Sequence, residues 1–420
     1  MFKKPIFVSL SPNIEKDDIF LSLKLIFRPW LFKENKNNLL LKEIEDYFKE
    51  YFKIKYVFLF NSGRSALMAI LKSLNLDNNS EILIPGFTCN ALSNPIIWAK
   101  LKPIYVDIQK ETLNYNLEEL EKKITPNTKA IVVQHTFGLP ENLDKILEIT
   151  KKYNLILIED CAHSLGATYQ GKKVGTFGKA SFFSFGRDKV ISSIFGGMAI
   201  TDDEEIAKKI KNFQDELDFP SNFWIFQQLL HPILTRYLIM PLYNFFELGR
   251  YLLILFQKIG ILSKSVYKVE KQGKIPKYFP KKMPLALAIL LKNQIKKIEK
   301  FNSHREEIAN FYYSNLKGLD SILLPKMAPG RVYLKFPIIF QEKTDKILNL
   351  ARKEKIFLDD GWRGKPIVPP DTILEKVGYQ EGSCKIAKEV SQKIINLPTH
   401  INITKKEAQR IVNFIKKYAI

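Results

Sequence analysis

The chain has 420 residues, of which 46% are hydrophobic and 26% charged, and this balance excludes a disordered or low-complexity protein. It carries 65 Lys and Arg against 44 Asp and Glu, a formal net charge of +21 that attracts anions such as nucleic acid, acidic lipid headgroups or phosphorylated substrates. No nucleic-acid motif accompanies this charge, and widely spread lysines are also typical of a solvated basic surface, so we expect no nucleic-acid partner.

The sequence shows no sign of export or of cross-linking. Its start, MFKKPIFVSLSPNIEKDD, is basic, but the apolar run is too short for a secretory signal and no small-residue cleavage site follows. Cys89, Cys161 and Cys384 are an odd number without CxxC spacing, so neither a disulfide framework nor a metal site is indicated. We therefore expect a protein of the reducing cytoplasm.

Residues 1–212 are expected to form a large α/β domain that begins with an N-terminal arm. Apolar runs rich in Val and Ile alternate with helical patterns, which is typical of βαβ units and a mostly parallel sheet. An open sheet of this kind binds its ligands at the carboxyl ends of its strands. The predicted strands are residues 56–60, 81–85, 102–107, 129–135 and 154–160.

Residues 213–275, called the 213–275 segment below, are expected to form an apolar helical insert. Between residues 219 and 246 the one charged residue is Arg236, a length comparable to the roughly 20 apolar residues that cross a bilayer. Three prolines interrupt this run: Pro220, Pro232 and Pro241. Together with many aromatic side chains, they favour short helices in a membrane interface, around residues 219–260, over a spanning helix. A buried helical hairpin or a dimer contact would explain the pattern equally well.

Residues 276–420 are expected to form a smaller C-terminal α+β domain. A long lysine-rich amphipathic helix comes first, LALAILLKNQIKKIEKFNSHREEIANFYYSNL. The candidate strands VYLKFPIIF and KIFLDD follow, and the helix KKEAQRIVNFIKKY closes the chain.

Three motifs carry candidate chemistry, and each has a plain structural explanation when taken alone. In FNSGRSALMAI, a strand runs through Gly63 into a helix whose N-terminal N–H groups favour a phosphate, although such turns are often purely structural. In ILIEDCAHSLGA, Asp160 ends an apolar strand, where a carboxylate needs a cation such as a protonated pyridine nitrogen. His163 follows three residues later. It could form a hydrogen bond to a phenolic oxygen, stack on a ring, or be a core histidine whose hydrogen bonds are satisfied within the protein.

The third motif is GKASFFSFGRDKVISSIFGGMAI, which supplies Ser184 and Lys189. A lysine between apolar strands has its pKa lowered by desolvation, as Schiff-base chemistry with an aldehyde requires. Taken alone, this lysine is better explained as a surface-loop residue of a lysine-rich chain.

Together the motifs place a phosphate cradle, a strand-end aspartate and a lysine in the order used by fold-type I pyridoxal-phosphate enzymes. From about residue 8 to the C-terminus, apart from the 213–275 segment, the chain resembles the DegT/DnrJ/EryC1/StrS family of sugar aminotransferases. The matching stretches are NSGRSAL, ILIPGFTCNALSNPI, KPIYVDI, VVQHTFGLPENLDKI, IEDCAHSLGATYQGKKVGTFGKASFFSFGRDK, GGMAIT and INLPTH.

The resemblance implies roles for individual residues. Lys189 would carry pyridoxal 5'-phosphate as a Schiff base and shuttle the proton between carbon atoms, and Asp160 would pair with the pyridine nitrogen, which keeps the ring an electron sink. The cofactor phosphate would be held by three residues: Gly63, Arg64 and Ser184.

Some positions depart from the family pattern. His163 stands where a glutamine commonly contacts the ring hydroxyl, and Cys89 stands where the ring-stacking aromatic is usual. Stacking on the ring is therefore assigned to Phe87 or His163.

The resemblance implies an aminotransferase that moves an amino group from glutamate to a keto-sugar, nucleotide-linked as in polysaccharide biosynthesis, and that works as a homodimer. A sugar dehydratase is one alternative, although the family's dehydratases carry histidine in place of this lysine. Another is a catalytically silent scaffold or regulator at the membrane. A third possibility combines aminotransferase activity with membrane contact: the enzyme would dock to the inner face of the membrane through residues 219–260.

Overall fold

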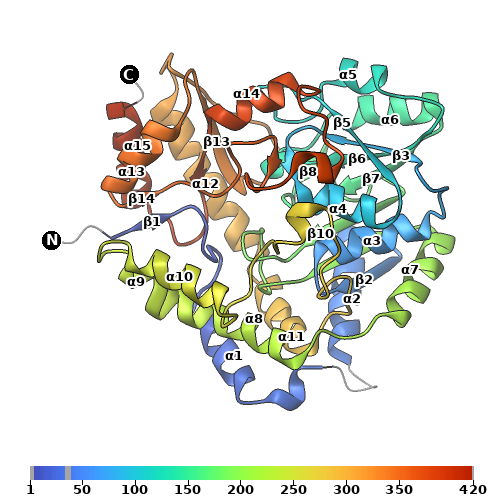
Figure 1. The fold of residues 1–420 in the computed structure, drawn as a ribbon, viewed down its shortest axis with the longest axis horizontal. Coiled ribbons are helices and arrows are strands. Elements are labelled where there is room, and N and C mark those ends of the chain that lie inside the picture. Colours follow the sequence, from blue (N-terminus) through green and yellow to red (C-terminus); the bar gives the residue numbers. More distant parts are fainter. Residues whose placement is uncertain (1–3, 34–38, 419–420) are drawn as a thin grey trace.

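A seven-stranded sheet forms the centre of the computed structural model, which describes residues 4–33 and 39–418 (Figure 1). Its strand order is β2-β11-β10-β7-β6-β3-β5; β11 runs antiparallel to both neighbours, and the other adjacent pairs are parallel. The strands are β2 (Tyr56–Phe60), β3 (Glu81–Pro85), β5 (Lys102–Val106), β6 (Thr128–Gln134), β7 (Ile156–Asp160), β10 (Ala180–Ser184) and β11 (Gly197–Thr201). The expected α/β class and all five predicted strands are confirmed.

Helices cover both faces of this sheet. In β2, Val57 and Leu59 belong to one buried cluster and Phe58 and Phe60 to the other, as the two-residue period of a strand requires. The first face is covered by α2 (Leu39–Phe52), α5 (Leu117–Lys122), α6 (Leu143–Tyr153) and α11 (Leu285–Ile295), and the second mainly by α3 (Gly63–Ser73), α4 (Asn90–Trp98) and α7 (Glu204–Glu216). Burial on both faces explains why the strands are nearly continuous apolar runs.

The C-terminal part contains a second, antiparallel sheet, β12-β13-β16, with its own buried cluster. Its elements are β12 (Ile322–Leu323), β13 (Lys335–Phe340), β16 (Ile394–Pro398), α12 (Ile298–Leu316), α13 (Asp345–Lys353), α14 (Lys385–Lys393) and α15 (Lys405–Tyr418). The predicted closing helix is α15. The long helix expected from the sequence is wrong in one respect, because it is divided into α11 and α12 at Lys297. The Lys297 ammonium forms ion pairs with Asp17 and Asp18 of α1 (Lys16–Ile26). The division of the chain at residues 212 and 275 stays a proposal.

The 213–275 segment folds as α8 (Asn222–Leu234), the π-helix η3 (Thr235–Ile239), α9 (Met240–Leu242) and α10 (Leu248–Lys258), at the lower left of Figure 1. Pro232 lies inside α8, which continues directly into the π-helix η3. The segment packs against α1 and buries Trp224 against Phe195. Within residues 4–33 and 39–418, every helix is too short or too polar to cross a bilayer.

Two short parallel pairs tie the parts of the molecule together. The N-terminal β1 (Ile6–Phe7) pairs with β14 (Ile356–Phe357), and β4 (Thr88–Cys89) pairs with β15 (Ile367–Val368). The remaining short elements are η1 (Pro29–Leu31), η2 (Thr136–Gly138), β8 (Thr168–Tyr169), β9 (Lys172–Lys173), η4 (Glu270–Gln272) and η5 (Leu374–Val377). The pairing of β4 with β15 brings the C-terminal part over the carboxyl ends of the central strands.

Candidate active site

A cavity of about 210 Å³ lies at the carboxyl ends of β2, β7 and β10. The central sheet supplies one wall. The C-terminal part supplies another, through the residues around Lys335 and Trp362, and the 213–275 segment closes a third side through Ser265 and Val266. The site is therefore assembled from three regions that are distant in sequence.

The turn between β2 and α3 forms a tight cradle. Ser62 caps α3 by accepting a hydrogen bond from the Ser65 N–H at 3.1 Å. The N–H groups of Gly63 and Arg64, at the start of the helix, have no intrahelical acceptor, and both residues line the cavity. A Cβ atom on Gly63 would lie 3.0 Å from the Ser184 Cβ, and one on Gly197 would lie 2.4 Å from the Gly63 N. A larger residue is therefore excluded at position 197 and crowded at position 63, and the cradle can hold an anion such as a phosphate.

Asp160 ends β7 with its carboxylate buried in the cavity. Among the described residues, its one hydrogen-bond donor is the Ala162 N–H, at 2.9 Å. Burial raises the pKa of Asp160 to about 6, against the opposing effects of that hydrogen bond and of the charges on Lys189 and His135. A buried carboxylate without a bonded cation is costly, so this position fits a ligand that brings a cation, such as a protonated pyridine ring.

Lys189 follows β10 and lines the same cavity, with its side chain half-buried. Its backbone is fixed, because the Lys189 carbonyl accepts a hydrogen bond from Asn13, which in turn accepts one from Arg305 at 2.7 Å. Its ammonium has no bonded partner in the described part of the chain, and burial lowers its pKa. A backbone held in place with a free, easily deprotonated amine suits covalent bonding to an aldehyde.

An aromatic group surrounds the neutral imidazole of His163. The His163 ring stacks on Phe137 with centroids 5.5 Å apart, and Trp362 meets it edge-on at 4.9 Å. Its Nδ1 accepts a hydrogen bond from the Phe137 N–H, and burial lowers its pKa well below the usual range. Phe87 is fully buried behind this group, against Phe137 and Trp362, and is absent from the cavity lining.

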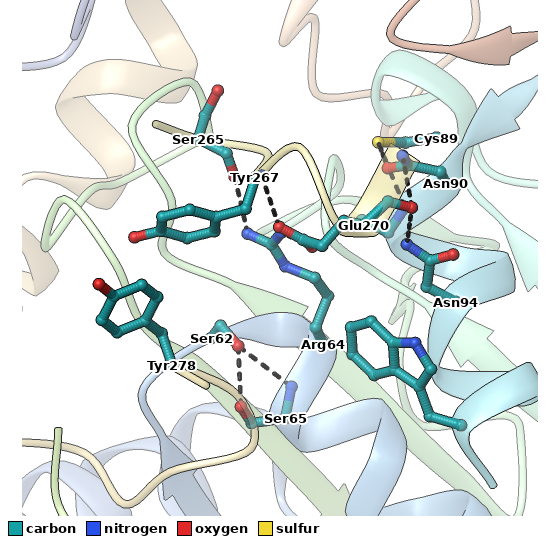
Figure 2. A network of polar contacts seen from close by, with 12 residues as sticks. Ser62, Arg64, Ser65, Cys89, Asn90, Asn94, Ser265, Tyr267, Glu270 and Tyr278 are labelled. Carbon is teal, nitrogen blue, oxygen red and sulfur yellow. Dashed lines mark hydrogen bonds and ion pairs between the residues drawn. The ribbon is translucent and has the colours of Figure 1, made fainter. Parts of the chain in front are cut away.

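The guanidinium of Arg64 is held by the 213–275 segment (Figure 2). It forms an ion pair with the fully buried Glu270 and donates to the Ser265 carbonyl at 2.9 Å. The Glu270 carboxylate also accepts from the Tyr267 N–H at 2.7 Å, and its backbone carbonyl accepts from Asn94 at 2.9 Å. The side chain of Arg64 thus links the 213–275 segment to the turn between β2 and α3.

Replacing Glu270 with alanine should lower the free energy of unfolding by about 3–5 kcal/mol, because the guanidinium of Arg64 then stays buried without its partner. Chemical denaturation of the cofactor-free protein measures this loss. Asp371→Ala is the matched control: it breaks the neighbouring, solvent-exposed Lys271–Asp371 pair and should cost about 1 kcal/mol or less. Equal effects of the two changes would contradict a fastening role.

The structure brings six of the seven predicted site residues to one cavity, and leaves one outside. The six are Gly63, Arg64, Asp160, His163, Ser184 and Lys189. Phe87 lies behind the wall. Lys335, Asp360, Trp362, Arg187 and Glu270 were not predicted; of these, the Asp-Gly-Trp turn after a candidate strand was the one visible signal, and it was a weak one.

Comparisons with known proteins show the family of the chain. The model of the DegT/DnrJ/EryC1/StrS aminotransferase family matches residues 33–217 and 254–416. An uncharacterized protein of Methanocaldococcus jannaschii is 30% identical over 380 residues, 89% of each chain, and a GDP-perosamine synthase of Caulobacter vibrioides is 26% identical over 375 residues, 88% of this chain and 87% of that one.

Solved structures share the fold over nearly the whole chain. A Helicobacter pylori aminotransferase involved in the biosynthesis of pseudoaminic acid superposes with a TM-score of 0.74 at 23% identity, covering 99% of both chains. An Escherichia coli GDP-4-keto-6-deoxy-D-mannose-3-dehydratase with bound hydrated PLP gives a TM-score of 0.73 at 20% identity, again with 99% of both chains covered.

Proposed function

The chain belongs to the DegT/DnrJ/EryC1/StrS aminotransferase family, whose members depend on pyridoxal 5'-phosphate, and on this basis we propose that it transfers an amino group from glutamate to the ketone of a nucleotide-linked sugar. The observation that carries the proposal is the meeting of the half-buried Lys189 and the buried Asp160 in one cavity, each without a bonded ion partner of its own in the described chain. The two groups complement an aldehyde and a ring cation on one ligand.

The residues of the cavity divide the work. The cofactor, when bound, supplies a conjugated ring that accepts electrons from the carbon that loses or gains a proton. Asp160 keeps the ring nitrogen protonated, and Lys189 holds the cofactor and carries the proton as general acid and base. Gly63 and Ser184 bind the phosphate. Arg64 contributes its backbone N–H at the start of α3, since Glu270 occupies its guanidinium.

Relatives support a sugar acceptor. They include the Caulobacter GDP-perosamine synthase, and the chain spans 87% of its length. A sugar dehydratase shares the fold and is the second candidate. The lysine at position 189 favours transamination, because a primary amine can hold the cofactor covalently as well as move a proton.

The test is a two-step spectroscopic and product assay. Glutamate should bleach the visible band of the cofactor-loaded protein, and a panel of nucleotide-linked keto-sugars should restore it while gaining an amino group, as seen by mass spectrometry. A product that loses water without gaining nitrogen would instead establish the dehydratase. Absence of any lysine-dependent band would favour the silent scaffold, a reading that leaves the complete set of Asp160, Ser184 and Lys189 unexplained.

We also propose a homodimer that contacts the inner face of the membrane through the 213–275 segment. The support is a row of exposed apolar side chains on η3, on the turn that joins α9 to α10 and on α10, among them Phe246 of the turn, 98% exposed, and Tyr251 of α10, 62% exposed. Arg236, Arg250 and Lys258 lie in the same helices, so the surface combines apolar and basic groups, as binding to anionic lipid requires.

Replacing Phe246, Tyr251 and Ile254 together with serine should weaken binding to anionic vesicles by about 100-fold or more, since each apolar side chain contributes roughly 1.5–3 kcal/mol when buried. Deleting the segment would be a poor test, because Trp224 and Glu270 hold the core and the site together. The control changes Leu147, Tyr153 and Ile373, which are exposed elsewhere. Unchanged vesicle binding contradicts the membrane contact, and sedimentation as a monomer after the triple change would identify the surface as the dimer contact.

A further inference from the structure

A second lysine faces the cavity from the C-terminal part. Lys335 begins β13, is 4% exposed and lines the same cavity as Lys189. Its ammonium donates a hydrogen bond to the Asp360 Oδ2 at 2.6 Å and lies 5.8 Å from the ring centre of Phe137 and 5.9 Å from that of Trp362. A buried ammonium in a ligand cavity is costly to maintain, which calls for a functional explanation.

Asp360 accepts one of the three N–H donors of the Lys335 ammonium. The Asp360 carboxylate is also held by the Asn396 side-chain amide at 2.9 Å and by the Trp362 N–H at 3.0 Å. An ammonium has three N–H donors, and Asp360 is the one acceptor for that of Lys335 among the described residues. Two donors therefore remain for a ligand.

The two arginines of the cavity already make bonds within the protein. Arg64 pairs with Glu270, as described above. Arg187 donates to the Ser263 carbonyl at 3.0 Å, to the Ser263 hydroxyl at 2.6 Å and to Gln228 at 3.2 Å. Lys189 is reserved for the cofactor. Lys335, with two donors left, and Arg187, whose Nε has no hydrogen-bond partner in the described chain, are thus the cations of the cavity lining that can still meet an anionic group of a substrate, and Lys335 offers more open donors.

Resting on the transamination proposed above, we propose that Lys335 binds the α-carboxylate of the amino donor. In an α-amino acid the carboxylate and the amine are bonded to the same carbon, so an amine that reacts in place of the Lys189 amine carries its carboxylate beside it. Lys335 is close enough to Lys189 for its charge to add to the effect of burial on the pKa of Lys189. The pyrophosphate of a nucleotide-linked sugar is separated from the reacting ketone by the sugar ring, and fits this position less well.

The test compares two donors that differ only in this carboxylate. Glutamate carries it, and 4-aminobutyrate has the same chain, amine and distal carboxylate without it. In Lys335→Met, the second-order rate constant for bleaching of the visible band by glutamate should fall by about 10- to 100-fold, the value of a hydrogen bond to a charged group, while that for 4-aminobutyrate changes less than about twofold. Calorimetric binding of glutarate, which cannot react, should weaken in parallel.

Two further variants keep the experiment decisive. Lys335→Met with Asp360→Asn removes both charges, avoids a buried unpaired carboxylate, and should show the same donor selectivity if the single variant folds poorly. Lys335→Arg should recover part of the glutamate rate. Equal losses with both donors, or an unchanged glutamate rate, would overturn the assignment while leaving the transaminase proposal standing; lack of a Lys189-dependent band in the unchanged protein would overturn both.

Discussion

Replacing Lys189 with alanine is expected to abolish the visible absorbance band of the cofactor-loaded protein and to lower amino transfer by about 10³-fold or more, because both the covalent attachment and the general acid–base group are lost. Borohydride treatment of the unchanged protein should fix the cofactor to the peptide that contains residue 189, and mass spectrometry of the digested protein measures this.

The same variant should fold well. Lys189 holds a partly desolvated ammonium in the cavity without a bonded partner, so its removal should leave the free energy of unfolding of the cofactor-free protein unchanged or increased. Lys179→Ala, ten residues earlier on the exposed edge and paired with Asp203, is the control and should keep the full band. Cofactor fixed to another lysine in the unchanged protein would contradict the assignment.

Replacing Asp160 with asparagine is expected to reduce amino transfer by about 10- to 100-fold, since the ring nitrogen loses a charged hydrogen-bond partner. Without cofactor the effect on stability should have the opposite sign. Burial raises the pKa of Asp160 from 3.8 to about 6, so the ionised carboxylate opposes folding. This cost is absent below the unfolded value and complete above about pH 6, where it reaches roughly 3 kcal/mol.

Asp160→Asn should therefore stabilise the cofactor-free protein by roughly 3 kcal/mol at pH 8 and by about half as much at pH 5, measured by denaturation at both values. Glu159→Gln is the matched control on the adjacent residue. Burial raises the pKa of the Glu159 carboxyl, but hydrogen bonds from His135 and from the N–H groups of Gly175 and Gly178 outweigh this effect and lower the pKa. Loss of the Glu159 carboxylate should therefore destabilise the protein at pH 8. Destabilisation by both changes would contradict the conclusion that the Asp160 carboxylate is buried without a bonded cation.

The sequence predicted the central sheet well because the information is local. Strands such as β2 and β7 are apolar runs bounded by turns, and their two-residue period sorts side chains onto the two faces whatever the rest of the chain does. The carboxyl ends of parallel strands meet at one edge, so Gly63 and Asp160 could be expected to lie together from their places alone.

The side-chain positions of Phe87 and Arg64 could not be predicted, because they depend on packing against residues that are distant in the sequence. Both lie at predicted strand ends, yet Phe87 turns into the aromatic group behind the cavity, and the guanidinium of Arg64 turns to Glu270, more than 200 residues away. An ion pair of this kind forms only where two buried groups converge, and residue spacing cannot show that.

The sequence by itself determined the family and the α/β class. It also predicted Lys189 and Asp160 as site residues, because each follows a short motif next to a regular element, and the structure places both at one cavity. Only the tertiary structure decided which groups meet them. Lys335 and Trp362 reach the cavity because β4 pairs with β15 and folds the C-terminal part over the sheet, and that pairing is fixed by burial of surfaces distant in sequence.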